Sequence, residues 1–317
     1  MEVNSYMQEM NNNLNVQEMI KDKILHGGRF GGNAARRMVY QLNKDEFNKY
    51  DKDHIRRDTK VYKNEFVVTS DNNFNTITGV KNCDCVDLAL EMKNTGLNPA
   101  ILNLASNKMP CGGYDKGLGA QEESLCYQST LPISLYQFGN PKYKCVREMG
   151  GNIKTGVYPM DINFGGIYSK SVTFFRYNIN RFYTLRETKF DCPIITVASL
   201  ANTDYHEYAS EEESNYFLPS GYMTEEGRRI EANKIRTIFR IALDNQHDSL
   251  VLGAFGCGAY HLMCDEVSGL FKEVLNEPEF KNKFKVVYFA IIEGKGSRKL
   301  VGPLGKFRAF YQDFGAL

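Results

Sequence analysis

The chain has 317 residues, 42% of them hydrophobic, which is enough for a folded protein with a substantial core in one large domain or two small ones. Its 39 Lys and Arg are balanced by 38 Asp and Glu, so no overall field attracts a polyanion. This balance disfavours general nucleic-acid binding, and affinity for a nucleotide-like polymer would have to come from a local site.

Cysteine usage and hydropathy indicate the cellular compartment of the protein. Eight cysteines and the lack of an apolar N-terminal segment predict an intracellular protein, in the cytoplasm or the nucleus. No stretch approaches the ~20 continuous apolar residues that cross a bilayer, so no membrane partner is expected. Cys83 and Cys85 are one residue apart, which differs from the two-residue spacing of zinc knuckles, and we expect neither a metal nor a cofactor.

Residues 1–60 are polar and carry a helical spacing of apolar side chains, as at Ile20 and Ile24. They are predicted to form an N-terminal helical extension that packs on a main domain of residues 61–317. The glycine-rich run at residues 27–32 follows no strand and lacks the Lys-Ser/Thr pair of a phosphate loop, so it indicates a hinge between helices.

From Tyr62 onward, strands and helices alternate as in a layered α/β protein. Residues 85–92 have the periodicity of a helix. The apolar runs predicted to form strands are residues 66–69, 100–105, 172–175, 193–200, 250–254 and 286–292. The last four are apolar enough to be central strands, and we expect a mixed sheet.

The segment most indicative of function is residues 110–124, with the sequence PCGGYDKGLGAQEES. Residues without side chains let a backbone approach a ligand closely, and nearby carboxylates can supply proton chemistry. The segment follows the apolar run at residues 100–105. Strand, glycine loop and helix therefore succeed one another in an arrangement that can cradle a phosphate.

Two later acidic segments have structural interpretations. Residues 211–213 are three consecutive glutamates and predict a solvated loop without chemistry. Thr224 is followed by two glutamates and predicts the N-cap of a helix. The buried face of that helix is predicted to contain Ile235, Ile238, Phe239 and Ala242.

A second glycine loop, GCGAYH at residues 256–261, follows another predicted strand. It fails the GxGxxG pattern of dinucleotide-binding proteins at its last position, so redox use of NAD is not expected. Its glycines free backbone N–H groups to approach phosphate oxygens, and a helix predicted to start near Met263 offers its positive end.

Together these blocks resemble the microbial-type poly(ADP-ribose) glycohydrolases of the macrodomain superfamily. Residues 103–106 resemble the strand that precedes the family's glycine triplet, residues 111–113 stand at the triplet, and residues 121–123 give its QEE signature. Residues 251–260 look like the family's diphosphate-binding loop, and the resemblance extends over residues 85–292. It implies a three-layer α/β/α macrodomain-like fold with a mixed sheet.

The resemblance also implies which residues form the site. Those implied to bind substrate are Asn103, Ser106, Cys111, Gly112, Gly113, Gln121, Phe255, Gly256, Cys257, Gly258, Ala259 and Tyr260. Glu123 is implied to protonate the leaving ribose oxygen and then to activate water, while Glu122 is implied to hold ribose hydroxyls.

Adjacent helical residues point about 100° apart, so Glu122 and Glu123 cannot flank one bond as the opposed carboxylates of an ordinary glycosidase. One of the two glutamates must therefore act alone as the general acid and base. A helix N-terminus lowers the pKa of a carboxyl, whereas a general acid near neutral pH needs a raised pKa. We therefore expect Glu123 to become a competent acid chiefly in the complex, where a bound diphosphate and the second carboxylate penalise its charge.

Several of these residues have a second interpretation. Asn103 could be a buried amide bonded to the backbone, and Tyr260, implied to pack on the distal ribose, could anchor its own loop. Cys257 lacks an activating base with an orienting partner, so a nucleophilic role is disfavoured. Cys111 stands where the family has the first glycine of its triplet, and a positive φ at this position would cost roughly 1–2 kcal/mol.

The predicted activity is metal-independent hydrolysis of the ribose–ribose O-glycosidic bonds of poly(ADP-ribose). The expected partners are the polymer and poly-ADP-ribosylated proteins, with ADP-ribose as the product. Two alternatives stay open: an ADP-ribose reader without turnover, and a hydrolase of mono-ADP-ribosylated protein or nucleic acid. Comparing polymer with singly modified substrate separates them.

Overall fold

The structure is a computed structural model that describes residues 2–150, 156–202, 215–293 and 304–315. The three glutamates expected in a solvated loop, residues 211–213, lie outside the described residues.

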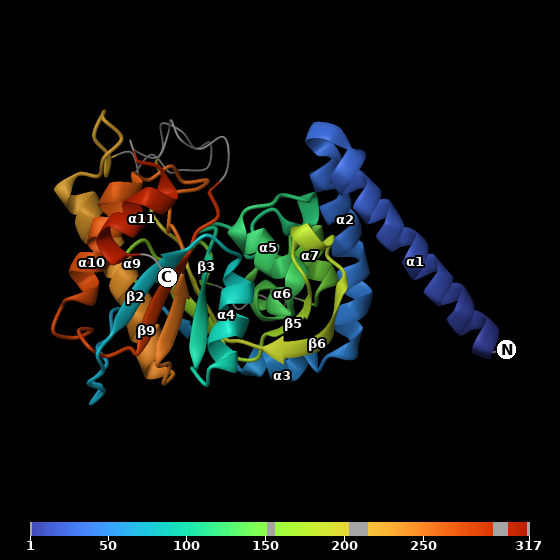
Figure 1. Cartoon of the computed structure of the whole chain (residues 1–317), viewed down its shortest axis with the longest axis horizontal. Helices are drawn as coiled ribbons and strands as arrows, with labels where there is room; N and C mark the ends of the chain where they lie inside the picture. The colour runs from blue at the N-terminus through green and yellow to red at the C-terminus, as the bar shows by residue number, and fades with distance from the viewer. Residues whose placement is uncertain (1, 151–155, 203–214, 294–303, 316–317) are drawn as a thin grey trace.

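The main sheet has seven strands in the order β1-β4-β7-β3-β8-β9-β2. Three of them, β2, β9 and β3, are labelled in Figure 1. Strands β7, β3, β8, β9 and β2 pair in parallel, whereas β4 pairs antiparallel with both β1 and β7, so the prediction of a mixed sheet is confirmed. The strands are β1 (Thr59–Tyr62), β2 (Ile77–Lys81), β3 (Pro99–Leu104), β4 (Gly166–Ser169), β7 (Ile194–Val197), β8 (Ser249–Leu252) and β9 (Val286–Ala290).

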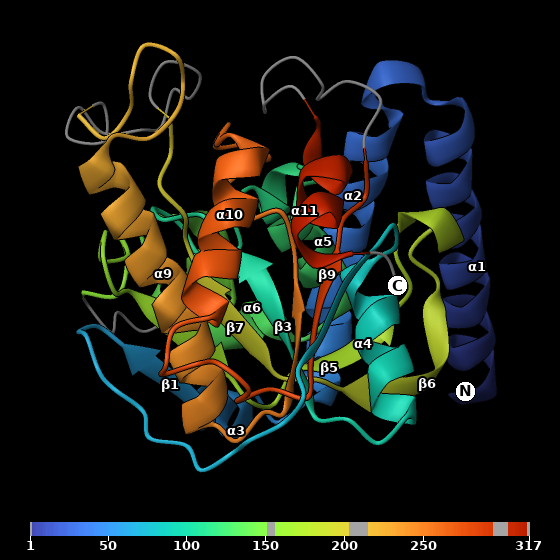
Figure 2. The ribbon, with the colours of Figure 1, turned by 60° about the vertical axis from the view of Figure 1, so that its left-hand side comes forward.

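Helices cover both faces of this sheet and give the expected three layers (Figure 2). Alternate side chains of β3 enter opposite cores, because successive residues of a strand point to opposite faces. Ile101 joins the core beneath α4 and α5, and Leu102 joins the core beneath α9 and α10. Within the described ranges, the helices after β2 are α4 (Cys85–Asn94), α5 (Gln121–Gln128), α6 (Leu131–Leu135), α7 (Lys144–Glu148), α9 (Glu225–Asp244), α10 (Cys264–Leu275) and α11 (Lys306–Phe314).

Three helices precede the sheet, and short 3-10 helices occur between the larger elements. Helix α2 lies against the face that carries α5, where Val39 is buried and the Asn43 amide donates hydrogen bonds to Tyr127 O at 2.9 Å and Tyr114 Oη at 3.0 Å. The glycine-rich run begins where α1 ends, and it continues into α2. These elements are α1 (Glu2–His26), α2 (Gly28–Glu46), α3 (Lys52–Arg57), η1 (Phe47–Lys49), η2 (Tyr114–Lys116), η3 (Tyr136–Phe138) and η4 (Ile179–Arg181).

The run predicted as a central strand at residues 172–175 lies outside the main sheet. It forms β5 (Thr173–Arg176), which pairs antiparallel with β6 (Leu185–Asp191) in a separate two-stranded sheet. Its apolar character comes from packing against the N-terminal region, since the ring of Phe175 meets that of Phe47 edge-on at 6.1 Å. Burial alone does not tell a central strand from one covered by a helical layer.

The strand predicted at residues 66–69 does not form, and two edge strands were not predicted. Val67 is 72% exposed, and Phe66 instead stacks on Tyr62 with ring centroids 4.8 Å apart. Strands β1 and β2 are short edge strands with mostly half-buried side chains, so they lack the apolar runs that marked the central strands.

The helices predicted at residues 85–92 and after Thr224 are confirmed by α4 and α9. Asp84 caps α4 by accepting a hydrogen bond from Val86 N, and Thr224 caps α9 by accepting one from Gly227 N. The predicted apolar face of α9 is buried in the core.

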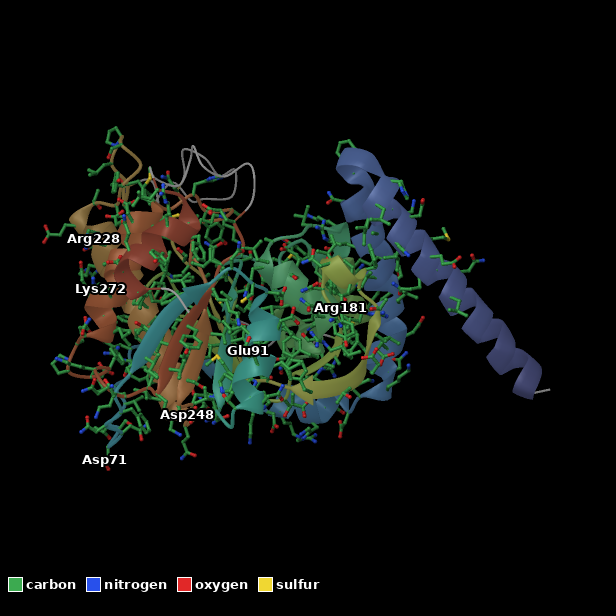
Figure 3. The ribbon with its side chains drawn as sticks, viewed as in Figure 1. Asp71, Glu91, Arg181, Arg228, Asp248 and Lys272 are labelled. Atoms are coloured by element: carbon green, nitrogen blue, oxygen red, sulfur yellow. The ribbon has the colours of Figure 1, made fainter. Side chains whose placement is uncertain are left out.

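Several of the charged side chains labelled in Figure 3 form ion pairs. Lys272 pairs with Asp313 at 3.2 Å, and Asp248 pairs with Lys285 at 2.9 Å. None of the helices in the described ranges combines the length and the apolarity needed to cross a membrane.

Candidate active site

The candidate residues lie at the carboxyl ends of three neighbouring parallel strands. Strand β3 lies between β7 and β8, so the segments that leave these strands emerge at one edge of the sheet. The glycine triplet follows β3, residues 198–202 follow β7, and the second glycine loop follows β8. Open α/β sheets bind their ligands at such an edge.

The first glycine loop folds back onto the carboxylates of α5. Gly113 N donates a hydrogen bond to Glu123 Oε1 at 2.8 Å, and Cys111 N donates to Glu122 Oε1 at 3.1 Å. Gly112 has a φ of +51°, and a Cβ at this position would lie 2.5 Å from Glu123 Oε1. The sequence therefore needs glycine at 112 for both conformation and space.

Glu122 is only 2% exposed and both of its carboxylate oxygens are engaged by the protein. Oε1 accepts hydrogen bonds from Cys111 N and from the Asn103 amide at 3.3 Å, and Oε2 accepts one from Ser106 N at 2.8 Å. Burial, followed by the nearby charge of Glu123, raises the pKa of Glu122 to about 8. Glu122 thus ties together the end of β3 and the start of the glycine loop.

Glu123 is also buried, at 5% exposure, but its two oxygens differ. Oε1 is fixed by Gly113 N, while no residue of the described structure forms a hydrogen bond with Oε2, although that atom is buried. A buried carboxylate oxygen without a partner is costly unless a ligand supplies one. The arrangement leaves Oε2 as the oxygen that can exchange a proton with a bound molecule.

The raised pKa of Glu122 predicts a pH dependence of stability. In the unfolded chain this carboxyl titrates near pH 4.5, and in the folded protein it titrates near pH 8, so the folded state binds more protons between these values. The free energy of unfolding should therefore fall as pH rises from about 4.5 to about 8, by at most about 1.4 kcal/mol per pH unit from this group.

Urea unfolding of wild type and Glu122→Gln at a series of pH values checks this expectation. The variant should show a shallower decline, because it lacks the titrating group, whatever its absolute stability. Buried Glu231 stays in both proteins and cancels in the comparison. Equal slopes would contradict a raised pKa at Glu122.

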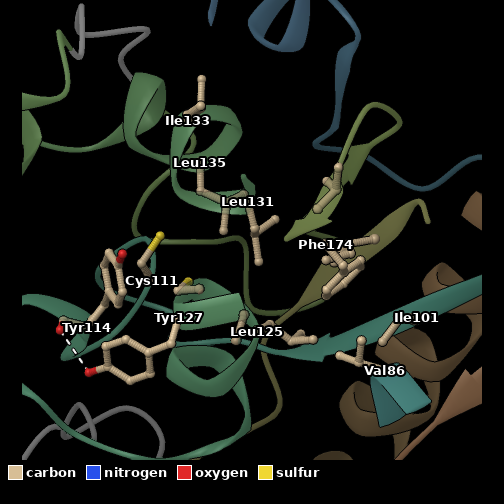
Figure 4. Packing of buried hydrophobic residues seen from close by; sticks show 14 of the residues in the cluster. Val86, Ile101, Cys111, Tyr114, Leu125, Tyr127, Leu131, Ile133, Leu135 and Phe174 are labelled. Carbon is tan, nitrogen blue, oxygen red and sulfur yellow. Dashed lines mark hydrogen bonds between the residues drawn. The ribbon is translucent and has the colours of Figure 1, made fainter. Parts of the chain in front are cut away.

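Cys111 adopts the left-handed conformation that a glycine at this position would favour, with a φ of +63°. Its side chain is fully buried in the hydrophobic core, where it lies beside Tyr114 (Figure 4). Burial, aided by the neighbouring thiol of Cys126, raises the pKa of Cys111 well above that of a free thiol. The loop thus accommodates the cysteine without placing a side chain in the site.

Gln121, Asn103 and Ser106 take part in the framework of the site. The Gln121 side chain accepts from Leu104 N at 2.9 Å and donates to Leu102 O at 2.8 Å, so it pairs with the backbone of β3. The Asn103 amide donates to Glu122, while its Oδ1 is buried with no hydrogen-bond partner among the described residues. The Ser106 hydroxyl accepts from Met109 N at 3.3 Å and shapes the start of the loop.

The second glycine loop offers backbone donors. Gly256 has a φ of +69°, and the N–H groups of Gly256, Gly258 and Ala259 form no hydrogen bond within the described part of the chain. Helix α10 begins at Cys264, as expected, and its N-terminus follows this loop. A bound diphosphate could accept from these donors.

The remaining residues of this loop are mostly buried. Phe255 and Cys257 are fully buried, and the Cys257 thiol lies 3.3 Å from Phe255 O, so neither presents a side chain to a ligand. The Tyr260 hydroxyl accepts a hydrogen bond from Asn107 N at 3.0 Å, which links the two glycine loops. This contact agrees with the anchoring interpretation of Tyr260 and leaves its ring half-buried at the site.

Three residues near the second loop were not identified from the sequence. Lys306, at the start of α11, has its Nζ 3.9 Å from the position of a Cβ on Gly258. Ser199 and Glu231 form a hydrogen bond beneath the same loop. Glu231 could have been found, because it lies four residues before Ile235 on the predicted apolar face, where a charged residue is unexpected.

No cluster of His, Cys, Asp and Glu in the described ranges has the arrangement of a metal site. The three-layer fold, with a glycine loop that holds the carboxylates of α5, defines a macrodomain-like α/β protein. Residues 33–177 match the family model for the catalytic domain of microbial-type PARG. This match makes the chain similar to the microbial-type poly(ADP-ribose) glycohydrolases, over a segment that contains the first glycine loop and α5.

Solved structures are similar to this chain at the level of the fold. The structure is similar to poly(ADP-ribose) glycohydrolase from Thermomonospora curvata, with 22% identity, a TM-score of 0.66 and coverage of 89% of this chain and 100% of that one. It is also similar to the Deinococcus radiodurans enzyme in complex with ADP-ribose, with 22% identity, a TM-score of 0.59 and coverage of 83% and 96%. No curated protein sequence matches the chain.

Proposed function

We propose that this protein hydrolyses the ribose–ribose O-glycosidic bonds of poly(ADP-ribose) and releases ADP-ribose, with Glu123 as general acid and base. The proposal depends most on the Glu123 carboxylate, which has one oxygen fixed by Gly113 N and the other buried without a described partner. A fixed carboxylate beside a glycine-lined loop is suited to proton transfer at a glycosidic oxygen.

In the proposed reaction, Glu123 donates its proton to the bridging ribose oxygen, which leaves as a hydroxyl when its bond to the anomeric carbon breaks. The anomeric carbon then gains oxocarbenium character, and the adjacent diphosphate stabilises this positive charge. Glu123, now ionised, takes a proton from the water that adds to the anomeric carbon. The position of that water would decide which face of the anomeric carbon it attacks.

The other site residues have binding roles in this proposal. The free N–H groups of Gly256, Gly258 and Ala259 would donate hydrogen bonds to the diphosphate, and Lys306 would add positive charge beside it. Tyr260 would pack on the distal ribose. Glu122 would accept hydrogen bonds from the ribose hydroxyls with the carboxylate lone pairs that its protein donors do not use. The polymer and poly-ADP-ribosylated proteins would be the substrates.

An assay with two substrates tests the proposal. Purified protein should release ADP-ribose from poly(ADP-ribose) at least ~10-fold faster than from a protein that carries single ADP-ribose units, because only the polymer has the ribose–ribose bond. Release from singly modified protein alone would favour the mono-ADP-ribose hydrolase. Calorimetric binding of ADP-ribose without release from either substrate would favour the reader.

A further inference from the structure

Glu231 is a buried carboxyl that the proposed reaction does not use. It lies on α9 with no exposed surface, and both of its oxygens accept hydrogen bonds from one short segment after β7. Oε1 accepts from the Ser199 hydroxyl at 2.8 Å, and Oε2 accepts from Leu200 N at 3.0 Å. Since an isolated buried carboxyl is costly, its partners indicate that this segment must be held in one position.

The segment held by Glu231 supports the second glycine loop at two points. The Ser199 hydroxyl would lie 2.2 Å from a Cβ on Gly256, so it packs directly against the backbone of that glycine. Three residues later, Asn202 N donates a hydrogen bond to Tyr260 O at 3.0 Å. The first and last residues of the loop that carries the free N–H groups therefore rest on residues 199–202.

We propose that Glu231 is a positioning residue for the second glycine loop, which it aligns for diphosphate binding by holding Ser199 and Leu200 beneath Gly256. This role rests on the proposed function of that loop in binding ADP-ribose. Glu231 itself does not contact the ligand, because Ser199 lies between its carboxylate and the loop. Its contribution is to the geometry of the backbone donors.

The hydrogen-bond pattern predicts which substitutions Glu231 tolerates. The Ser199 hydroxyl is also within 3.1 Å of Leu200 O, to which it can donate. A glutamine at 231 could donate from Nε2 to the Ser199 oxygen and accept from Leu200 N with Oε1, so every partner stays satisfied. A methionine of similar size would leave Leu200 N without its acceptor.

The charged surroundings of Glu231 fit a neutral replacement. Burial raises the pKa of Glu231 to about 7 against the lowering effect of Lys234, which lies on the same helix, and Glu266 of α10 raises it further. The site therefore holds a neutral carboxyl as readily as an ionised one near neutral pH. Glutamine resembles that neutral form.

The test measures ADP-ribose affinity by calorimetry and polymer hydrolysis for wild type, E231Q, E231M and I241A. Ile241 is a fully buried residue of the same helix that contacts Gly166 of β4, so I241A lowers stability without touching the loop. We expect E231M to raise the Kd for ADP-ribose and the KM for polymer about tenfold or more with little change in kcat. E231Q should stay within about threefold of wild type, and I241A should leave the Kd unchanged.

Amide hydrogen exchange in the ligand-free protein gives a readout that does not depend on activity. It is followed at Asn202, Cys257 and Leu262, whose N–H groups donate to Tyr260 O, Ala254 O and Gly256 O. E231M should exchange faster there than wild type, E231Q and I241A. If E231M does not fold, S199A replaces it in the test. S199A is a smaller change and should also increase the rate of amide exchange. The inference is overturned if exchange and Kd in E231M or S199A match wild type, if E231Q behaves like E231M, or if I241A raises the Kd equally. Failure of wild type to bind ADP-ribose would instead reject the proposed function, and the exchange data would still decide the role of Glu231.

Discussion

Glu123→Gln is expected to slow release of ADP-ribose from poly(ADP-ribose) by about 10²–10⁴-fold, with the Kd for ADP-ribose within a few-fold of wild type. Glutamine keeps the shape of the side chain, and its carbonyl oxygen can still accept the hydrogen bond from Gly113 N. It cannot carry the transferable proton. Single-turnover release of ADP-ribose measures the rate, and calorimetry measures binding.

Glu225→Gln is the matched control, since Glu225 is an exposed acid in the first turn of another helix, α9. It should retain full activity. Residual activity of Glu123→Gln within tenfold of wild type would remove Glu123 from the role of general acid. If substrate binding makes Glu123 a competent acid, the pH profiles of the two rate constants should also differ. The profile of kcat reports the complex, whereas that of kcat/KM reports the free enzyme.

The parts of the site that lie close together in sequence could be predicted. Residues 100–105 were recognised as a strand by their apolar run, and the glycine triplet with the acids at 122 and 123 follows within twenty residues. Local patterns of this kind record turn chemistry and helix starts, which depend on near neighbours in the chain. Strand β8 and its glycine loop were recognised for the same reason.

The different roles of Glu122 and Glu123 could not be derived from their spacing in the sequence. They depend on which backbone N–H groups face each oxygen. Ser106 and Cys111 hold Glu122, and among the residues that the structure describes only Gly113 holds Glu123. These contacts follow from the path of the loop in space. The support of the second loop by Glu231 is more distant still, because it joins residues that are 32 positions apart on different elements.

The placement of β5 shows a different limit. Its sequence is as apolar as that of a central strand, and the difference lies in what covers it: the N-terminal helices and α5 rather than neighbouring strands of the main sheet. Likewise, the short edge strands β1 and β2 are set by pairing with β4 and β9, which no local pattern records.

Gly112→Ala is expected to reduce polymer hydrolysis by at least ~100-fold, since a misplaced catalytic group loses this much through small displacements. The added methyl would lie 2.5 Å from Glu123 Oε1 and 3.2 Å from Glu122 Oε2, and the backbone has a φ of +51°. Either the loop or the carboxylates must move, and the hydrogen bond from Gly113 N to Glu123 would be disrupted. The left-handed conformation adds roughly 1–2 kcal/mol of strain, so the melting temperature should also fall.

Gly269→Ala separates the loss of site geometry from a general effect of adding a methyl group. Gly269 lies within α10, and a Cβ there meets no atom within 4 Å, so alanine should leave activity unchanged and stabilise the protein by up to about 1 kcal/mol. Cys111 shows that the loop tolerates a side chain at position 111, although it does not at position 112. Its side chain enters the core instead of the site, and so the loop accepts a Cβ at 111 while a Cβ at 112 meets both carboxylates. A fully active Gly112→Ala variant would mean that the loop is displaced from Glu123 during the reaction.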